Sequence, residues 1–263
     1  MKLRFALVLL CALVPVCLYA ADGVQAIRSR GVLRVAVKNR GSLNRAVHND
    51  PAHFQKRGFE LELAQAIADH ILGPGARLEL KMFHRRYRLP AVVDGTVDMA
   101  IAMFAVNDRN RAQVAFSRPY YEGGLAVVQV GRSTVRTLKD LDGMTISALD
   151  EKMTDPGGTL QKLAAAQGAK IKVRRYESFN GAVKALRDGK ADAMVSEDAN
   201  LDIYTAGGHG DLKRSPLLSH ESFAVVVRKG DTELLDSVNQ VIARLRESGR
   251  LAAMIRKWKL PSP

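Results

Sequence analysis

A short pattern that occurs twice constrains the fold of this chain more than any other feature. Residues 91–102 (AVVDGTVDMAIA) and residues 182–195 (AVKALRDGKADAMV) each run from a helix end through Asp-Gly, two further residues and Asp into an apolar strand. Patterns of this kind are common in α/β proteins, but both copies here keep the second Asp. The copies lie about 90 residues apart, whereas solenoid repeats are shorter and more numerous. The pattern therefore predicts two α/β lobes of similar build.

The strand of the first copy leads into the first candidate site. Residues 99–104 are apolar on both faces, as expected for a parallel strand that helices cover on both sides. The polar stretch of residues 107–111 (NDRNR) follows this strand. Ligands of open α/β sheets bind at the carboxyl ends of the strands. We therefore expect part of a binding site in this loop.

The N-terminal segment has the features of an export signal. Lys2 and Arg4 give it a positively charged start, and an apolar run follows that is too short to span a bilayer comfortably. Small or aliphatic residues close the segment, so residues 1–20 are predicted to be a signal peptide that is cleaved from a periplasmic protein. Both cysteines, Cys11 and Cys17, lie in this segment. We therefore expect no disulfide and no thiol chemistry in the mature chain.

The charge of the chain is strongly basic. Its 40 Lys and Arg residues exceed its 27 Asp and Glu residues, which gives a net charge of +13. Such a balance fits an anionic ligand, a negatively charged envelope surface or nucleic acid. The export signal and the scattered basic residues count against nucleic acid. Many of these charges are expected to be ordinary solvated surface groups.

The sequence lacks the motifs of several enzyme classes. It contains no nucleotide-binding glycine loop, no zinc motif and no nucleophile elbow, and its six histidines do not have metal-ligand spacing. We therefore expect neither a cofactor nor a metal.

The N-terminal half shows alternating strands and helices. Residues 31–37 and 77–83 are predicted to form the first two strands. The helix between them has apolar residues spaced to bury one face, and it stops at the GPG of residues 73–75. Polar or basic loops, residues 38–51 and 84–88, follow the two strands at their carboxyl ends.

Several phrases along the chain carry a family resemblance. They are GVLRVAVK from Gly31, GFELELAQAIA from Gly58, VAFSRPYY ending at Tyr121, LKDLDG from Leu138, PGGT from Pro156 and the closing stretch VVVRKGDTELLDS to Leu260. In this order and spacing, the chain resembles family 3 of the periplasmic solute-binding proteins of ABC transporters, which carry polar amino acids. The resemblance extends roughly from Gly31 to Leu260.

The resemblance implies a fold and a function. The fold is a two-lobed α/β clamp of type II, in which each lobe is a mostly parallel sheet with flanking helices. Lobe one would comprise residues 22–124 and 223–263, and lobe two residues 125–222. Tyr120 and Tyr121 would pack at the crossing between the lobes. A monomeric clamp would capture a small polar, anionic or amino-acid-like ligand and deliver it to an ABC permease in the inner membrane, with a hinge closing on the ligand.

The family's ligand-carboxylate site is altered in lobe one. Where the family has an Arg that clamps the carboxylate, this chain has Asn110, flanked by Arg109 and Arg111. Ala105 stands where the family has a small hydroxyl residue. An amide replaces neither the charge nor the fork of a guanidinium. Either a neighbouring Arg takes its place or the ligand is not an ordinary α-amino acid; alternatively, both arginines are solvated surface charges.

Lobe two supplies the other predicted contacts. Gly158 and Thr159 directly precede the predicted helix of residues 160–166 and, by resemblance, would touch the ligand carboxylate, since free N–H groups at a helix start bind anions. The alternative is that the glycines only form a turn and an N-cap. By resemblance, Glu197 would pair with the ligand ammonium; the alternative is a surface Glu in a polar turn.

The remaining wall of the cleft is predicted to be basic. Arg40 and Arg85 lie in the loops after the first two strands, where the family stacks aromatic rings on the ligand. Together with Arg109 and Arg111 they would make a cationic cleft. This is the basis for predicting an anionic ligand.

Two rival functions remain open. Cyclohexadienyl dehydratase resembles this chain in its export signal and its PGGT-like turn, but its chemistry needs a general acid. The matching position here is Asn200, which cannot donate a proton in that role, so we predict a protein that is not an enzyme. The second rival is an exported accessory protein that uses the same clamp to hold a protein partner, for example a dehydrogenase.

Overall fold

The structure is a computed structural model, and it describes residues 23–38, 58–83, 85–150, 155–201, 210–258 and 260. The predicted signal peptide therefore lies outside the described residues. Within these ranges, no helix is both long and apolar enough to cross a membrane.

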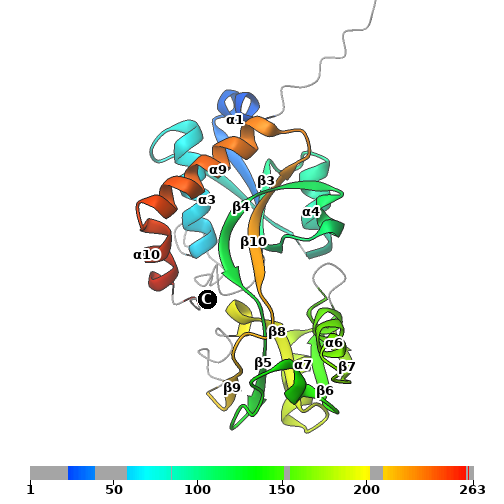
Figure 1. The fold of residues 1–263 in the computed structure, drawn as a ribbon. Helices are drawn as coiled ribbons and strands as arrows, with labels where there is room; N and C mark the ends of the chain where they lie inside the picture. Colours follow the sequence, from blue (N-terminus) through cyan, green and yellow to red (C-terminus); the bar gives the residue numbers. More distant parts are fainter. Residues whose placement is uncertain are drawn as a thin grey trace, which may run out of the picture.

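The first sheet has five strands in the order β2-β1-β3-β10-β4 (Figure 1). Its strands are β1 (Val32–Lys38), β2 (Arg77–Phe83), β3 (Met99–Ala105), β4 (Val114–Gly123) and β10 (Glu221–Arg228). Strand β1 pairs in parallel with β2 and β3, whereas β10 runs antiparallel to both β3 and β4. The strand that arrives last along the chain therefore lies inside the sheet.

Helices cover both faces of this sheet. They are α1 (Val24–Arg30), α3 (Phe59–Leu72), α4 (Arg88–Val93), α5 (Asp108–Arg111), α9 (Thr232–Glu247) and α10 (Arg250–Lys257), with the 3-10 turn η2 (Arg85–Tyr87) before α4. Met99 and Ile101 of β3 pack with α1, α3, α9 and α10, whereas Ala100 and Phe104 pack on the α4 side. Successive side chains of a strand point to opposite faces. This explains the two-sided apolar pattern of β3, which was predicted from its sequence.

The second sheet also has five strands, in the order β7-β6-β8-β5-β9. Its elements are β5 (Leu125–Val130), β6 (Thr145–Leu149), β7 (Lys172–Tyr176), β8 (Ala193–Glu197), β9 (Leu212–Arg214), the helices α6 (Pro156–Ala166) and α7 (Phe179–Arg187), and the 3-10 turn η3 (Leu138–Leu141). Strand β6 pairs in parallel with β7 and β8, and β5 runs antiparallel to β8 and β9. The two-lobed α/β fold is confirmed. In each sheet only one strand, β10 or β5, runs antiparallel to its neighbours, so the sheets are mixed but mostly parallel, as predicted.

The repeated pattern forms the same local structure in both lobes. The backbone N–H of Asp98 donates to Arg34 O at 2.9 Å, and Arg34 N–H donates back to the Asp98 carboxylate at 2.8 Å. In the second lobe, Asp192 and Thr145 make the same reciprocal pair at 2.8 and 2.7 Å. The preceding glycines, at positions 95 and 189, have φ of +78° and +69°, which side-chain-bearing residues rarely adopt. In each lobe, this reciprocal pair of hydrogen bonds thus joins the start of one buried strand to the neighbouring strand.

The chain crosses between the sheets at two places that lie in contact. Strand β4 ends at Gly123 and β5 begins at Leu125, while β10 returns to the first sheet from Glu221. A Cβ atom on Gly124 would lie 1.9 Å from the carbonyl oxygen of Ser219, just before the return crossing. The two crossing segments therefore pack backbone against backbone. The division into domains at residues 124 and 223 stays a prediction.

We expect Asp98→Ala to destabilise the protein by about 3 kcal/mol. The change leaves two cations, Arg30 and Arg34, without the carboxylate that pairs with them at 2.6 and 3.0 Å, and it breaks the reciprocal pair of hydrogen bonds to β1. Urea unfolding would measure the loss. The matched control is Asp94→Ala in the same pattern, whose exposed carboxylate accepts the backbone N–H of Thr96 two residues away rather than that of another strand. Equal stability of the two variants would contradict the role of the reciprocal pair.

We expect Gly124→Ala to destabilise the protein by about 3 kcal/mol, because the added methyl group meets backbone that cannot rotate away. Gly210→Ala is the control, since a Cβ there has nothing within 4 Å. Both variants are compared by urea unfolding. A Gly124→Ala protein as stable as the control would show that the crossings are not tightly packed.

Candidate ligand-binding site

The two predicted binding loops lie at strand ends beside the crossings. Ala105 ends β3 and pairs with Phe223 of β10, while Glu197 ends β8 and pairs with Leu125 of β5. Phe223 and Leu125 each lie within a few residues of a crossing. The carboxyl ends of β3 and β8 are therefore brought together at the junction of the two lobes.

Asn107 organises the loop after β3. Its side-chain oxygen accepts the backbone N–H of Asn110 at 2.9 Å, and its amide group donates to the carbonyl of Ala105 at 3.3 Å. This is an N-cap for the short helix α5, a role that Asn commonly fills. Asn110 is buried and Ala105 is half-buried. The loop thus has a defined shape without a charged side chain at position 110.

Of the four arginines predicted to form a cationic wall, the structure describes the side chain of one, Arg111. Arg111 is exposed, and its guanidinium carbon lies 5.9 Å from the ring centroid of Phe116 in β4, a cation–π arrangement within its own lobe. Arg40 and the side chains of Arg85 and Arg109 lie outside the described residues. The cationic cleft stays a prediction.

The N-terminus of α6 is capped by the chain's own carboxylate. Asp155 Oδ1 accepts the backbone N–H of Gly158 at 3.0 Å, and Arg175 lies 3.1 Å from the same oxygen. Thr159 N–H donates to the carbonyl of Asp155 at 2.9 Å. A ligand carboxylate at Gly158 would have to displace Asp155. The Asp-Pro pair at the helix start is a recognisable sequence signal for this cap.

Glu197 is a buried carboxylate with two donors of its own. Its exposed fraction is 4%, and its Oε2 accepts from Asn200 Nδ2 at 2.6 Å and from Ser196 Oγ at 3.0 Å. Asn200 stands at the position predicted from the resemblance to lack a general acid. In this structure its amide fixes the orientation of the Glu197 carboxylate.

Asp198, the next residue, links the two lobes. Its carboxylate accepts the Tyr121 hydroxyl at 3.0 Å, and its backbone N–H donates to Gly124 O at 2.8 Å. Burial raises the pKa of Asp198 above its usual range. Tyr121 belongs to β4 in the first sheet, so this hydrogen bond joins lobe one to lobe two.

Glu221 is the acidic residue that sequence reasoning missed. It is the first residue of β10 and pairs opposite Gly123. Burial, together with the charges of Glu197 and Asp198, raises its pKa to about 7. No local motif marks this residue, because its neighbours come from a segment more than twenty residues earlier in the chain. The junction thus gathers three carboxyl groups, a setting that favours a cation.

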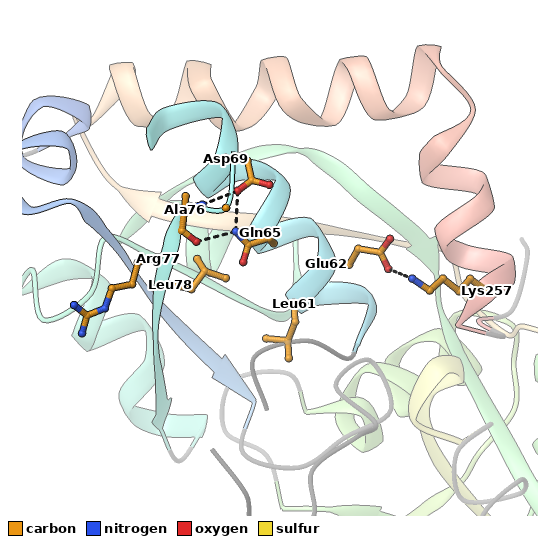
Figure 2. Close-up of a pocket in the computed structure, with 9 residues that line it drawn as sticks. Leu61, Glu62, Gln65, Asp69, Ala76, Arg77, Leu78 and Lys257 are labelled. Carbon is orange, nitrogen blue, oxygen red and sulfur yellow. Dashed lines mark hydrogen bonds and ion pairs between the residues drawn. The ribbon is translucent and has the colours of Figure 1, made fainter. Parts of the chain in front are cut away.

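A separate hollow of about 660 Å³ lies between α3, the start of β2 and α10 (Figure 2). Four of its polar side chains, those of Glu62, Gln65, Asp69 and Lys257, are engaged in hydrogen bonds or an ion pair within the hollow. Gln65 donates to Asp69 at 2.8 Å and to Ala76 O at 2.9 Å, while Lys257 pairs with Glu62 at 2.8 Å. These contacts hold α3 against β2 and α10, so the hollow is a weaker candidate site than the junction.

In the described ranges, no three His, Cys, Asp or Glu residues are placed to hold a metal ion.

Comparisons with known proteins agree on one family. Residues 43–261 match the sequence profile of the bacterial extracellular solute-binding proteins, family 3. The L-cystine-binding protein TcyJ of Escherichia coli (strain K12) is 28% identical over 259 residues, which cover 95% of this chain and 94% of that protein. A mutant of ArgBP from T. maritima superposes with a TM-score of 0.71 at 29% identity, covering 89% of this chain and 98% of the other.

One solved structure bears on the enzymatic alternative. The ancestral amino-acid-binding protein AncCDT-1, described as a precursor of cyclohexadienyl dehydratase, superposes with a TM-score of 0.70 at 24% identity. It covers 89% of this chain and 98% of its own. At this identity the likeness concerns the fold alone.

We expect the free energy of unfolding to fall as the pH rises from about 4.5 to about 7. Over this range the folded protein keeps a proton on Glu221 that the unfolded chain has released, because folding raises this pKa from 4.5 to about 7. The stabilising contribution is present below pH 4.5 and lost above pH 7, and it is on the order of 3 kcal/mol.

Glu221→Gln should remove this part of the pH dependence, which urea unfolding at a series of pH values would measure. Glu122→Gln, an exposed Glu in β4, serves as the control and should keep it. Identical pH profiles for the wild type and Glu221→Gln would show that Glu221 titrates normally.

Proposed function

We propose that this chain, which belongs to family 3 of the bacterial extracellular solute-binding proteins, captures a polar amino-acid-like ligand between its lobes. It would then present the ligand to the permease of an ABC transporter. Relatives whose names state L-cystine and arginine binding support an amino acid as the ligand class. The predicted export signal supports a periplasmic location for this step.

The observation that carries the proposal is the environment of Glu197. A buried carboxylate at the carboxyl end of a strand, oriented by Ser196 and Asn200, is a suitable partner for a ligand ammonium. It lies beside the crossing segment at Leu125, where a closing lobe would cover it. A bound cation would also favour the ionised form of the neighbouring carboxyls, Asp198 and Glu221, whose pKa values are raised in the folded protein.

The carboxylate end of the ligand would be held differently from the usual manner. Asn110 cannot supply a guanidinium, so we assign that role to Arg109, whose backbone lies in the same short helix α5. The N–H of Gly158 would contribute once Asp155 moves aside. Ala105, Thr159 and Arg111 would form the adjoining wall, with Arg40 and Arg85 in the loops after β1 and β2.

Ligand capture would shift a hinge equilibrium rather than make or break a bond. A ligand that contacts both lobes favours the closed arrangement by its differential affinity for it. Asn200 has no acidic proton to give to a leaving group, which supports binding over dehydration. We further propose that the protein works as a monomer, since each chain contains both halves of the clamp.

We expect a polar amino acid to raise the melting temperature of the mature protein by several degrees at a hundredfold excess over its dissociation constant. The reason is that a ligand bound only by the folded state stabilises it by about 2.7 kcal/mol at that excess. The measurement is a thermal-shift scan against L-arginine, L-glutamine, L-cystine, dicarboxylates and inorganic phosphate.

Glu197→Gln should abolish the shift with a cationic or zwitterionic ligand, whereas Glu233→Gln on the outer helix α9 should leave it unchanged. A shift with phosphate or dicarboxylates alone would favour the anionic ligand predicted from the sequence. If no compound shifts the melting temperature, the proposal fails. The hypothesis of an accessory protein that binds a protein partner is then favoured, and that partner would be sought by pull-down from an envelope extract.

A further inference from the structure

Tyr120 and Tyr121 are adjacent in β4, yet both side chains lie in the same core. Neighbouring residues of a regular strand point to opposite faces. Here Tyr121 pairs with Phe223 and Pro119 pairs with Ala224, so Tyr120 is an extra residue in a β-bulge. Both tyrosines are at most 2% exposed, and both rings contact Phe59, at centroid distances of 5.9 and 6.4 Å. The bulge thus turns two consecutive residues into one packing unit.

Tyr120 is bound to a buried carboxylate in lobe one. Its hydroxyl donates to Glu60 Oε1 at 2.5 Å, and the same oxygen accepts the backbone N–H of Met103 at 2.9 Å. Glu60 is fully buried at the start of α3. Burial and the adjacent carboxylate raise the pKa of Tyr120 well above its usual value, so the hydroxyl keeps its proton. One oxygen of Glu60 therefore ties β4 to β3.

The backbone that Glu60 holds is in a rare conformation. Met103 has φ of +54°, in the left-handed region that costs energy for a residue with a side chain. Three residues of β3, from position 101 to 103, lie opposite a single residue of β10, because Phe104 pairs with Ala224 and Ala100 with Val226. Ala105 and the Asn107 loop follow at once. The conformation of Met103 therefore sets where the binding loop of lobe one begins.

Tyr121 reaches the other half of the candidate site. Its ring stacks on Phe223 with a centroid distance of 6.0 Å, and its hydroxyl donates to Asp198 at 3.0 Å. Asp198 directly follows Glu197 at the end of β8. The hydrogen bonds of the two adjacent tyrosines thus reach residues on the two opposite sides of the candidate site.

We infer that Tyr120 and Tyr121 are paired positioning residues that hold the two halves of the ligand site in register. Tyr120 fixes the start of the 105–111 loop through Glu60 and Met103, and Tyr121 fixes Glu197 through Asp198. Both are too deeply buried to contact a ligand between the lobes, so they act through other residues. The inference rests on the proposed function, since it assigns both strand ends to one binding site.

The test uses Tyr→Phe variants, which keep every ring contact and lose only a hydroxyl. Tyr120→Phe and Tyr121→Phe are compared with the wild type and with Tyr176→Phe, a half-buried tyrosine in β7 of lobe two. Isothermal titration with L-arginine and L-glutamine measures binding. We expect each of the first two variants to raise the dissociation constant about tenfold, in keeping with the loss of one hydrogen bond to a charged group. Tyr176→Phe should leave the dissociation constant within about twofold of the wild-type value.

A second measurement separates positioning from general stability and needs no ligand. Hydrogen exchange should quicken in residues 99–111 for Tyr120→Phe and in residues 193–201 for Tyr121→Phe, each without the other. Uniformly faster exchange with unchanged dissociation constants would overturn the inference and leave the tyrosines as core residues. If the wild type binds neither amino acid, the proposed function has failed on this panel, and the exchange pattern alone decides the positioning role.

Discussion

The close contact of the two crossing segments is the constraint on which the site depends. Gly124 has no room for a side chain because the backbone of Ser219 lies against it. This contact brings the start of β5 close to the start of β10, and the carboxyl ends of β8 and β3 are paired to these two strands. The candidate ligand contacts of both lobes are therefore placed by the crossings, and any motion of one lobe against the other must pass through them.

Much of the fold could be predicted because its signals are local. The Asp-Gly pattern specifies a left-handed glycine after a helix and a carboxylate that clasps the next strand, and both features depend on a few neighbouring residues. The apolar run of β3 similarly specifies a strand covered on two faces. Two short patterns and a family resemblance were enough for two α/β lobes. The antiparallel strands of each sheet were not specified, because they enter from distant parts of the chain.

The candidate site was less accessible to sequence reasoning for the same physical reason. Glu221 owes its pKa to Glu197 and Asp198, which join it only when β10 returns. The bulge that turns Tyr120 and Tyr121 to one side depends on the register between β4 and β10, and no residue type in the sequence indicates it. Asp155 is different, since an Asp before Pro at a helix start could have been recognised as an N-cap that competes for Gly158. The arginines in the predicted binding loops pointed to a cationic cleft, whereas the carboxyl groups that meet at the junction favour a cation.

The strand order of the first sheet also governs the sequence of events during folding. Strand β4 has β10 as its neighbour, and β10 separates it from β3. All five strands of the second sheet, in contrast, come from one uninterrupted stretch between Leu125 and Arg214. As the chain emerges, every strand of the second sheet precedes residues 221–228, whereas β3 and β4 of the first sheet have no strand between them until those residues arrive. A chain that ends before residue 221 therefore lacks the strand that joins β3 to β4, and its first sheet is incomplete.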